Sequence, residues 1–174
     1  MHTGGRHRLW YFIDMLIRPI HERDLPAVAR LFRALAAEFI VHESTPEGAA
    51  NFLRENDEVG LRGFIARGHV YHVAEIDGEI VGFIGVRERR HLFHMFVAKH
   101  LHGRGIARRL WEVARRAAVE DGHDGIFTVN SSNFALPVYL AWGFVRTAPT
   151  QCTNGLFYNP MQLIESAAHL VRTA

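Results

Sequence analysis

Two glycines separated by one residue, Gly103 and Gly105, stand where a β-strand pattern gives way to a helical one. Glycine lets the backbone turn tightly there, and the N–H groups of such a turn point outward beside the positive end of the helix dipole. The arrangement is suited to binding a phosphate or pyrophosphate. Position 108 is Arg, so the dinucleotide fingerprint G-x-G-x-x-G is not satisfied, and the Gly-Lys-Ser/Thr phosphate loop is also missing. The glycines alone are equally consistent with a tight connection that holds no ligand.

The residues around this turn must be positioned by a sheet with helices. Asp77-Gly78 lies between two β-rich runs and predicts a hairpin of 69–76 with 79–86, because a type I′ turn needs positive φ at both central residues. The other expected strands are Leu16–Ile20 at a sheet edge, His91–Ala98, Gly125–Asn130, and a final pair over Gly143–Thr147 and Phe157–Ile164. The expected helices run from an Asp24 N-cap to Phe39, between Glu47 and Arg67 with a break near Asn56 or Gly60, from Ile106 to Asp121, and from Phe134 to Trp142. This order predicts an α/β fold, with a mixed, largely antiparallel sheet flanked by helices.

The 174 residues correspond to one domain, since soluble domains run roughly 100–200 residues. We expect this domain to span 15–166, with 1–14 as a disordered extension, from tagging or a misassigned start, and 167–174 as a tail. The longest apolar runs are far shorter than the ~18 residues of a spanning helix, so we expect no membrane association and a cytoplasmic location. The single cysteine, Cys152, excludes an intramolecular disulfide.

Composition argues against two other classes of site. The formal net charge is +2, too small to indicate a nucleic-acid partner, and among the basic residues only Lys99 is a lysine. Twelve histidines are present, but they form no H-E-x-x-H motif and no tight cluster with carboxylates. We therefore expect no metal and no nucleic acid.

Two segments resemble motifs of the GNAT superfamily of N-acetyltransferases. The segment 102–107, His-Gly-Arg-Gly-Ile-Ala, is similar to its acyl-CoA-binding pattern Gln/Arg-x-x-Gly-x-Gly/Ala, with His102 as the departure. The segment 130–144 resembles the later pattern Asn-x-x-Ala-x-x-x-Tyr-x-x-x-Gly-Phe, with Ser132 in place of the asparagine and Asn130 and Asn133 on either side as alternative contacts for the pantetheine arm. Ala135, Tyr139, Gly143 and Phe144 match that pattern in register.

The resemblance implies the GNAT fold and an acyltransferase that uses acetyl-CoA as cosubstrate and needs no metal. The acetyl group would pass to a primary amine by direct attack, through a tetrahedral intermediate. The resemblance places the cofactor against Met95, Phe96, Val97, His102, Gly103, Arg104, Gly105, Ile106, Ala107, Arg108, Ser132, Asn133 and Tyr139. Arg104, Arg108 and Arg109 would add bidentate contacts to the pyrophosphate.

The resemblance also suggests the residues that move protons. Tyr139 occupies the general-acid position, where it would protonate the CoA thiolate; the alternative is a tyrosine that only packs on the sheet. The glutamate of histone-acetylating members falls on His91, whose unperturbed pKa near 6.5 suits a general base. The alternatives are a polar strand-end residue at 91 and water as the base. Strand alternation predicts that His94, three residues on, lies on the opposite face.

The sequence leaves several questions open. A catalytically weak acyl-CoA-binding or sensor module is the main alternative, favoured by the missing strand glutamate and disfavoured by Tyr139. A further alternative is a nucleic-acid-binding domain that uses the arginines of the surface. Such a domain would bind DNA or RNA with an affinity that depends strongly on salt. The resemblance places the acceptor site at the first two helices. The acceptor could be a protein amine, a polyamine, an amino acid or an aminoglycoside, and the sequence does not decide between a monomer and a homodimer.

Overall fold

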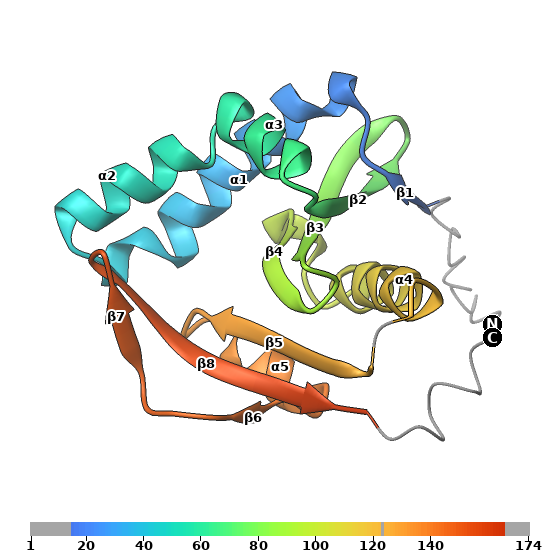
Figure 1. Cartoon of the computed structure of the whole chain (residues 1–174). Coiled ribbons are helices and arrows are strands. Elements are labelled where there is room, and N and C mark those ends of the chain that lie inside the picture. The colour runs from blue at the N-terminus through green and yellow to red at the C-terminus, as the bar shows by residue number, and fades with distance from the viewer. Residues whose placement is uncertain (1–14, 123, 166–174) are drawn as a thin grey trace, which may run out of the picture.

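A curved sheet with helices on both faces makes up the chain in the computed structural model, which describes residues 15–122 and 124–165 (Figure 1). The strands are β1 Met15–Pro19, β2 Val70–Ile76, β3 Glu79–Arg87, β4 His91–Val97, β5 Ile126–Ser131, β6 Val145–Arg146, β7 Gln151–Thr153 and β8 Leu156–Ile164. The α-helices are α1 Leu25–Phe39, α2 Pro46–Glu55, α3 Glu58–Ala66, α4 Ile106–Glu120 and α5 Leu136–Ala141. Short 3-10 turns cover Glu22–Asp24, Val41–Glu43 and Lys99–Leu101. The expected extension 1–14 and tail 167–174 lie outside the described residues.

The sheet order is β1-β2-β3-β4-β5-β8-β6, and β7 pairs with β8. Every pairing is antiparallel except that of β4 with β5. This confirms the predicted mixed, largely antiparallel sheet. Within the described ranges, no helix has both the length and the apolar content to cross a bilayer.

Local sequence signals explain several elements. Asp77 and Gly78 have φ values of 50° and 81°, as the predicted type I′ hairpin turn requires. The helical region after residue 46 breaks at Asn56 because Asp57 caps a new helix, its carboxylate accepting a hydrogen bond from Gly60 N at 2.9 Å. Strand β7 was not among the predicted strands; its three residues are all exposed and carry no periodic pattern.

An apolar layer packs on each face of the sheet. The layer under α1 and α3 includes Leu25, Val28, Phe32, Leu61, Tyr71, Val73 and Phe83. The layer under α4 includes Ile84, Leu92, Val97, Ile106, Leu110, Trp111, Phe127, Val129, Phe144 and Met161. Tyr139 of α5 also belongs to the second layer.

A β-bulge changes the facing of side chains along β4. Val86 pairs with Leu92 and Gly85 pairs with His94, so Phe93 is an extra residue without its own partner on β3. Leu92 and Met95 consequently pack on the same layer, although they are three residues apart. The bulge also brings His91 and His94 to the same face of the sheet. The prediction that they lie on opposite faces was wrong, because strict alternation fails at Phe93.

Strands β4 and β5 separate soon after they meet. They pair only at His91 with Thr128 and at Leu92 with Val129. Beyond that point β4 stays bonded to β3, while β5 stays bonded to β8. The β5-facing edge of Met95–Val97 is therefore left without a strand partner, and a gap opens in the middle of the sheet.

A buried ion pair fixes the start of α1. Asp24 accepts hydrogen bonds from Arg18 at 2.6 Å and from His21 N at 2.8 Å, and Arg18 also bonds Glu75 of β2. The carboxylate therefore does not cap α1 through its side chain as predicted, although Asp24 holds the N-cap position. The hydrogen bond from Arg18 is the main reason why the pKa of Asp24 lies below its usual value.

We expect Asp24→Ala to lower the free energy of unfolding by about 3 kcal/mol, because it leaves Arg18 half-buried with one carboxylate fewer. Urea denaturation at pH 7 measures the change. The matched control is Glu22→Ala, whose carboxylate pairs with the exposed Arg62 at the surface and should therefore contribute much less than that of Asp24. Equal losses in both variants would contradict an anchoring role for the Asp24 pair.

Candidate active site

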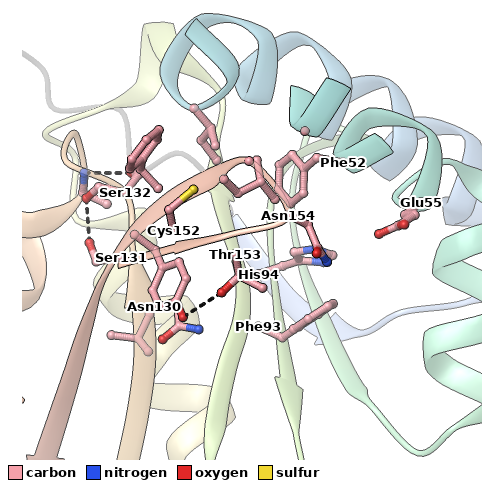
Figure 2. A pocket seen from close by; sticks show the side chains of 18 of the residues that line it. Phe52, Glu55, Phe93, His94, Asn130, Ser131, Ser132, Cys152, Thr153 and Asn154 are labelled. Atoms are coloured by element: carbon pink, nitrogen blue, oxygen red, sulfur yellow. Dashed lines mark hydrogen bonds between the residues drawn. The ribbon is translucent and has the colours of Figure 1, made fainter. Parts of the chain in front are cut away.

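The gap between β4 and β5 leads into two adjoining cavities. The smaller cavity, of about 500 Å³, runs from the end of β4 to the glycine turn and α5. The larger cavity, of about 780 Å³, lies between β4, β5, α2 and the β7–β8 hairpin (Figure 2). Met95, Phe96, Ser132, Ala135 and Tyr139 line both of them. A ligand threaded through the gap would therefore have one end in each cavity.

Most residues predicted to bind a cofactor line the smaller cavity. These are Met95, Phe96, Val97, His102, Gly103, Gly105, Ile106, Ala107, Arg108, Ser132 and Tyr139. Arg104 and Asn133 are not part of its wall. The Asn133 side chain instead donates to Glu43 at 2.7 Å and accepts from Asn159 at 2.9 Å, so it ties three segments together.

The glycine turn has the geometry of an anion site. Gly103 and Gly105 have φ values of 75° and 77°, and an added Cβ on either would meet no neighbour within 4 Å. Glycine is thus needed here for its backbone conformation and not for space. Gly105 is the N-cap of α4, no side chain caps that end, and the first turn contains no acidic residue. The first N–H groups of α4 are therefore available to a phosphate.

Arginines and aromatic rings surround this turn. Arg104, Arg108 and Arg109 are all exposed, and Arg108 pairs with Glu112 of the next helical turn at 3.2 Å. His102 Nε2 lies 2.7 Å from the Val97 carbonyl, to which it donates, and its ring contacts Phe39 and Phe134. The side chain of His102, the residue that departs from the family pattern, thus connects the end of β4 with the turn.

Tyr139 stands between the two cavities. Its side chain is 5% exposed, and its ring packs edge-on against Trp142 and Phe144. Burial raises the pKa of the phenol above its usual value, so the hydroxyl keeps its proton at neutral pH. Among the described residues, none forms a hydrogen bond with that hydroxyl. A protonated, unpartnered hydroxyl at this junction can donate to a ligand.

His91 lies in the wall of the larger cavity, at the point where β4 and β5 part. Its Nδ1 is 2.8 Å from the Thr128 hydroxyl. Burial, and next the charge of Arg87, lowers the pKa of the imidazole to about 4. The ring is therefore neutral at pH 7. If Nδ1 carries the hydrogen and donates it to Thr128, Nε2 is free to accept a proton.

His94 was not predicted as a site residue, yet it lines the same cavity. The side chain is 4% exposed, and its Nδ1 lies 2.9 Å from the Tyr71 hydroxyl. Burial lowers its pKa to about 3, while Nε2 has no hydrogen-bond partner within the described residues. The bulge at Phe93 places the ring here, and no periodicity in the sequence indicates a bulge.

Contacts between distant segments close the larger cavity. Thr45, the N-cap of α2, donates its backbone N–H to Gly155 O at 2.9 Å. A Cβ added to Gly48 would lie 2.6 Å from Asn154 O, so only glycine allows α2 to approach the β7–β8 turn this closely. Phe52 and Glu55 reach the cavity from α2, and Cys152 reaches it from β7 (Figure 2). The first two helices were expected at this site from the resemblance, whereas the β7–β8 hairpin was not.

In residues 15–122 and 124–165 no group of three or more His, Cys, Asp or Glu side chains could hold a metal ion.

A comparison with family models finds a match to an acetyltransferase (GNAT) domain over residues 40–165. The chain belongs to the GNAT acetyltransferase family. This match spans β4, the glycine turn, β5 and α5, and it agrees with the resemblance carried by the motifs at 102–107 and 130–144. No curated protein sequence matches the chain significantly.

Solved structures of GNAT proteins share the fold. A GCN5-related N-acetyltransferase from Rhodopseudomonas palustris is 24% identical, with a TM-score of 0.71 over 86% of this chain and 95% of its own. The PaiA N-acetyltransferase from Thermoplasma acidophilum, solved with coenzyme A, is 15% identical, with a TM-score of 0.72 over 87% and 99%. The acetyltransferase YncA from Salmonella typhimurium, solved with acetyl-CoA, is 20% identical, with a TM-score of 0.60 over 88% and 96%.

Proposed function

We propose that this GNAT protein transfers an acetyl group from acetyl-CoA to a primary amine. The observation that carries the proposal is the junction of the two cavities at Tyr139, with the glycine turn at the far end of the smaller one. A cosubstrate and an acceptor can meet at this junction from opposite sides. The coenzyme A and acetyl-CoA bound to relatives of the same fold support the assignment of the smaller cavity to the cofactor.

The cofactor would lie along the smaller cavity in three parts. Its pyrophosphate fits the free N–H groups that start α4, where Arg108 adds positive charge. Its pantetheine amides can pair with the open edge of Met95–Val97, since those backbone groups lack a strand partner on that side. The thioester then reaches the region of Tyr139. This orientation leaves the larger cavity to the amine.

The reaction follows from these positions. The lone pair of the neutral amine attacks the thioester carbon, and backbone N–H groups at the strand edge stabilise the negative oxygen of the tetrahedral intermediate. When the C–S bond breaks, the sulfur takes a proton from the Tyr139 hydroxyl. The amine nitrogen loses its extra proton to His91 Nε2 or to water, which completes the amide. The Tyr139 phenolate then regains a proton from solvent.

Direct transfer to an amine predicts that CoA thiol appears in proportion to acetylated amine. We expect release of CoA thiol from acetyl-CoA with at least one member of a panel of primary amines, and none with tertiary amines. A thiol-reactive dye measures the release, and mass spectrometry of the product confirms the amide. Tight CoA binding without turnover on any amine would instead support an acyl-CoA sensor.

Replacing Tyr139 by Phe should lower kcat by roughly 10²- to 10⁴-fold, which is the usual contribution of a positioned acid. The ring contacts with Trp142 and Phe144 remain, so the melting temperature and the KM for acetyl-CoA should change little. Steady-state kinetics and thermal unfolding of both proteins measure this. Unchanged turnover would remove Tyr139 from the mechanism.

If His91 is the base, His91→Ala should lower kcat about 10²-fold or more between pH 6 and 8. The ring is already neutral throughout this range, because its pKa of about 4 lies below it. Protonation of His91 therefore inhibits wild-type activity only as the pH falls toward 4, and not near 6.5. Exposed His100 provides the matched control as His100→Ala. A pH–rate profile of His91→Ala that coincides with wild type would assign the proton to water.

A further inference from the structure

The charged side chains that line the larger cavity at neutral pH are all negative. Two carboxylates of α2, Glu47 and Glu55, lie in its wall, whereas no lysine or arginine of residues 15–122 and 124–165 does. Within the described residues neither glutamate forms an ion pair or a side-chain hydrogen bond. Because His91 and His94 are neutral at pH 7, the side chains of the wall carry a net charge of two negative units.

The two carboxylates are spread along the cavity. They are eight residues apart on one helix, which is ~12 Å along the axis at 1.5 Å per residue. Figure 2 shows the Glu55 carboxylate directed toward the side of the cavity where His94 lies. An acceptor that meets both glutamates must therefore be elongated.

His94 provides an independent indication of a ligand. Its Nε2 is buried and has no partner in the part of the chain that the structure describes, and its ring lies in the cavity wall. A buried polar atom left without a hydrogen bond is costly and rare in native proteins. If Nδ1 donates to the Tyr71 hydroxyl, Nε2 offers a lone pair to an N–H group of the ligand.

Aromatic rings complete the surroundings. The same cavity is lined by Phe52 from α2, Phe93 from the bulge of β4 and Tyr158 from β8. Their faces attract ammonium groups and also pack against methylene chains. The cavity therefore offers hydrogen-bond acceptors, from the carboxylates and the neutral imidazole, together with aromatic faces. This combination suits organic cations and not anions.

We propose that the acceptor of this GNAT protein is a linear polyamine with at least three amine groups, which presents one neutral amine to the thioester while Glu47 and Glu55 hold its remaining ammonium groups. The inference rests on the proposed acetyl transfer and specifies its acceptor. The ammonium nearest the β4–β5 gap loses its proton to water before attack, and the distal ammonium groups stay charged against the carboxylates. An acceptor with a single positive charge leaves at least one carboxylate unpaired.

The test compares amines that differ in charge but not in the reacting group. Thiol release from acetyl-CoA is measured with butylamine, 1,4-diaminobutane and spermidine at the same ionic strength. We expect kcat/KM to rise at least 10-fold from butylamine to spermidine, and the advantage to shrink as salt screens the carboxylates. Equal kcat/KM for butylamine and spermidine would overturn the proposal while leaving acetyl transfer intact.

Variants of the glutamates locate the effect. Glu55→Gln and Glu47→Gln should each raise the KM for spermidine about 5- to 20-fold, with the KM for butylamine and for acetyl-CoA within twofold of wild type. The matched control is Glu79→Gln, an exposed glutamate at the β2–β3 hairpin outside both cavity walls. A glutamine variant that weakens butylamine and spermidine equally, or not at all, would also overturn the proposal.

A binding measurement separates this proposal from acetyl transfer itself. Calorimetric titration of spermidine into the protein with CoA needs no turnover. If no amine releases thiol, acetyl transfer fails, and tighter spermidine binding to wild type than to Glu55→Gln still supports the cationic site. If spermidine binds neither protein, the cationic site is wrong whatever the outcome of the assay.

Discussion

The parting of β4 and β5 after two residue pairs is the constraint on which the site depends. A parallel strand pair that continued would bury its backbone groups in a ladder and close the sheet. Here each strand is held from its other side, β4 by β3 and β5 by β8, so the two can diverge without loss of the sheet. The divergence leaves an open backbone edge at Met95–Val97 and two cavities that meet beside it. The glycine turn, α5 and α2 matter because each one closes or lines this gap.

How much the sequence could predict depends on how local each signal is. The type I′ hairpin at Asp77-Gly78, the helix after Gly105 and the position of Tyr139 follow from short stretches of residues, and the structure agrees on where they lie. The bulge at Phe93 leaves no trace in the pattern of apolar residues, which is why His94 was placed on the wrong face. The wall formed by α2 and the β7–β8 turn depends on a contact between Gly48 and Asn154, which only folding brings together. The smaller cavity, which the proposed function assigns to the cofactor, is thus predictable from motifs, and the larger cavity is not.

The formal net charge of +2 does not show how unevenly charge is distributed along the site. Exposed arginines and the free N–H groups of α4 surround the glycine turn, whereas the opposite cavity is lined by carboxylates that form no ion pair with any residue the structure describes. The two ends therefore favour ligands of opposite sign. Such separation orients approaching ligands, because each end attracts its own partner and repels the other. In the proposed reaction it would keep the pyrophosphate of the cofactor and the distal ammonium of the acceptor at opposite ends of the gap.

Between these ends the titratable groups are held neutral by burial. Burial lowers the pKa of the His91 and His94 imidazoles, so both rings are neutral at pH 7, and the phenol of Tyr139 keeps its hydrogen. In the proposed reaction, a region without fixed charge would strengthen the effect of backbone dipoles on a developing oxyanion, because no neighbouring counter-ion screens them. The same neutrality has a cost for the acceptor, because an ammonium is poorly solvated there and is not nucleophilic. In the proposed reaction, deprotonation would therefore be favoured as the reacting amine enters the gap, while the distal ammonium stays at the carboxylates of α2. The change in polarity along the site would then both select the acceptor and prepare it for attack.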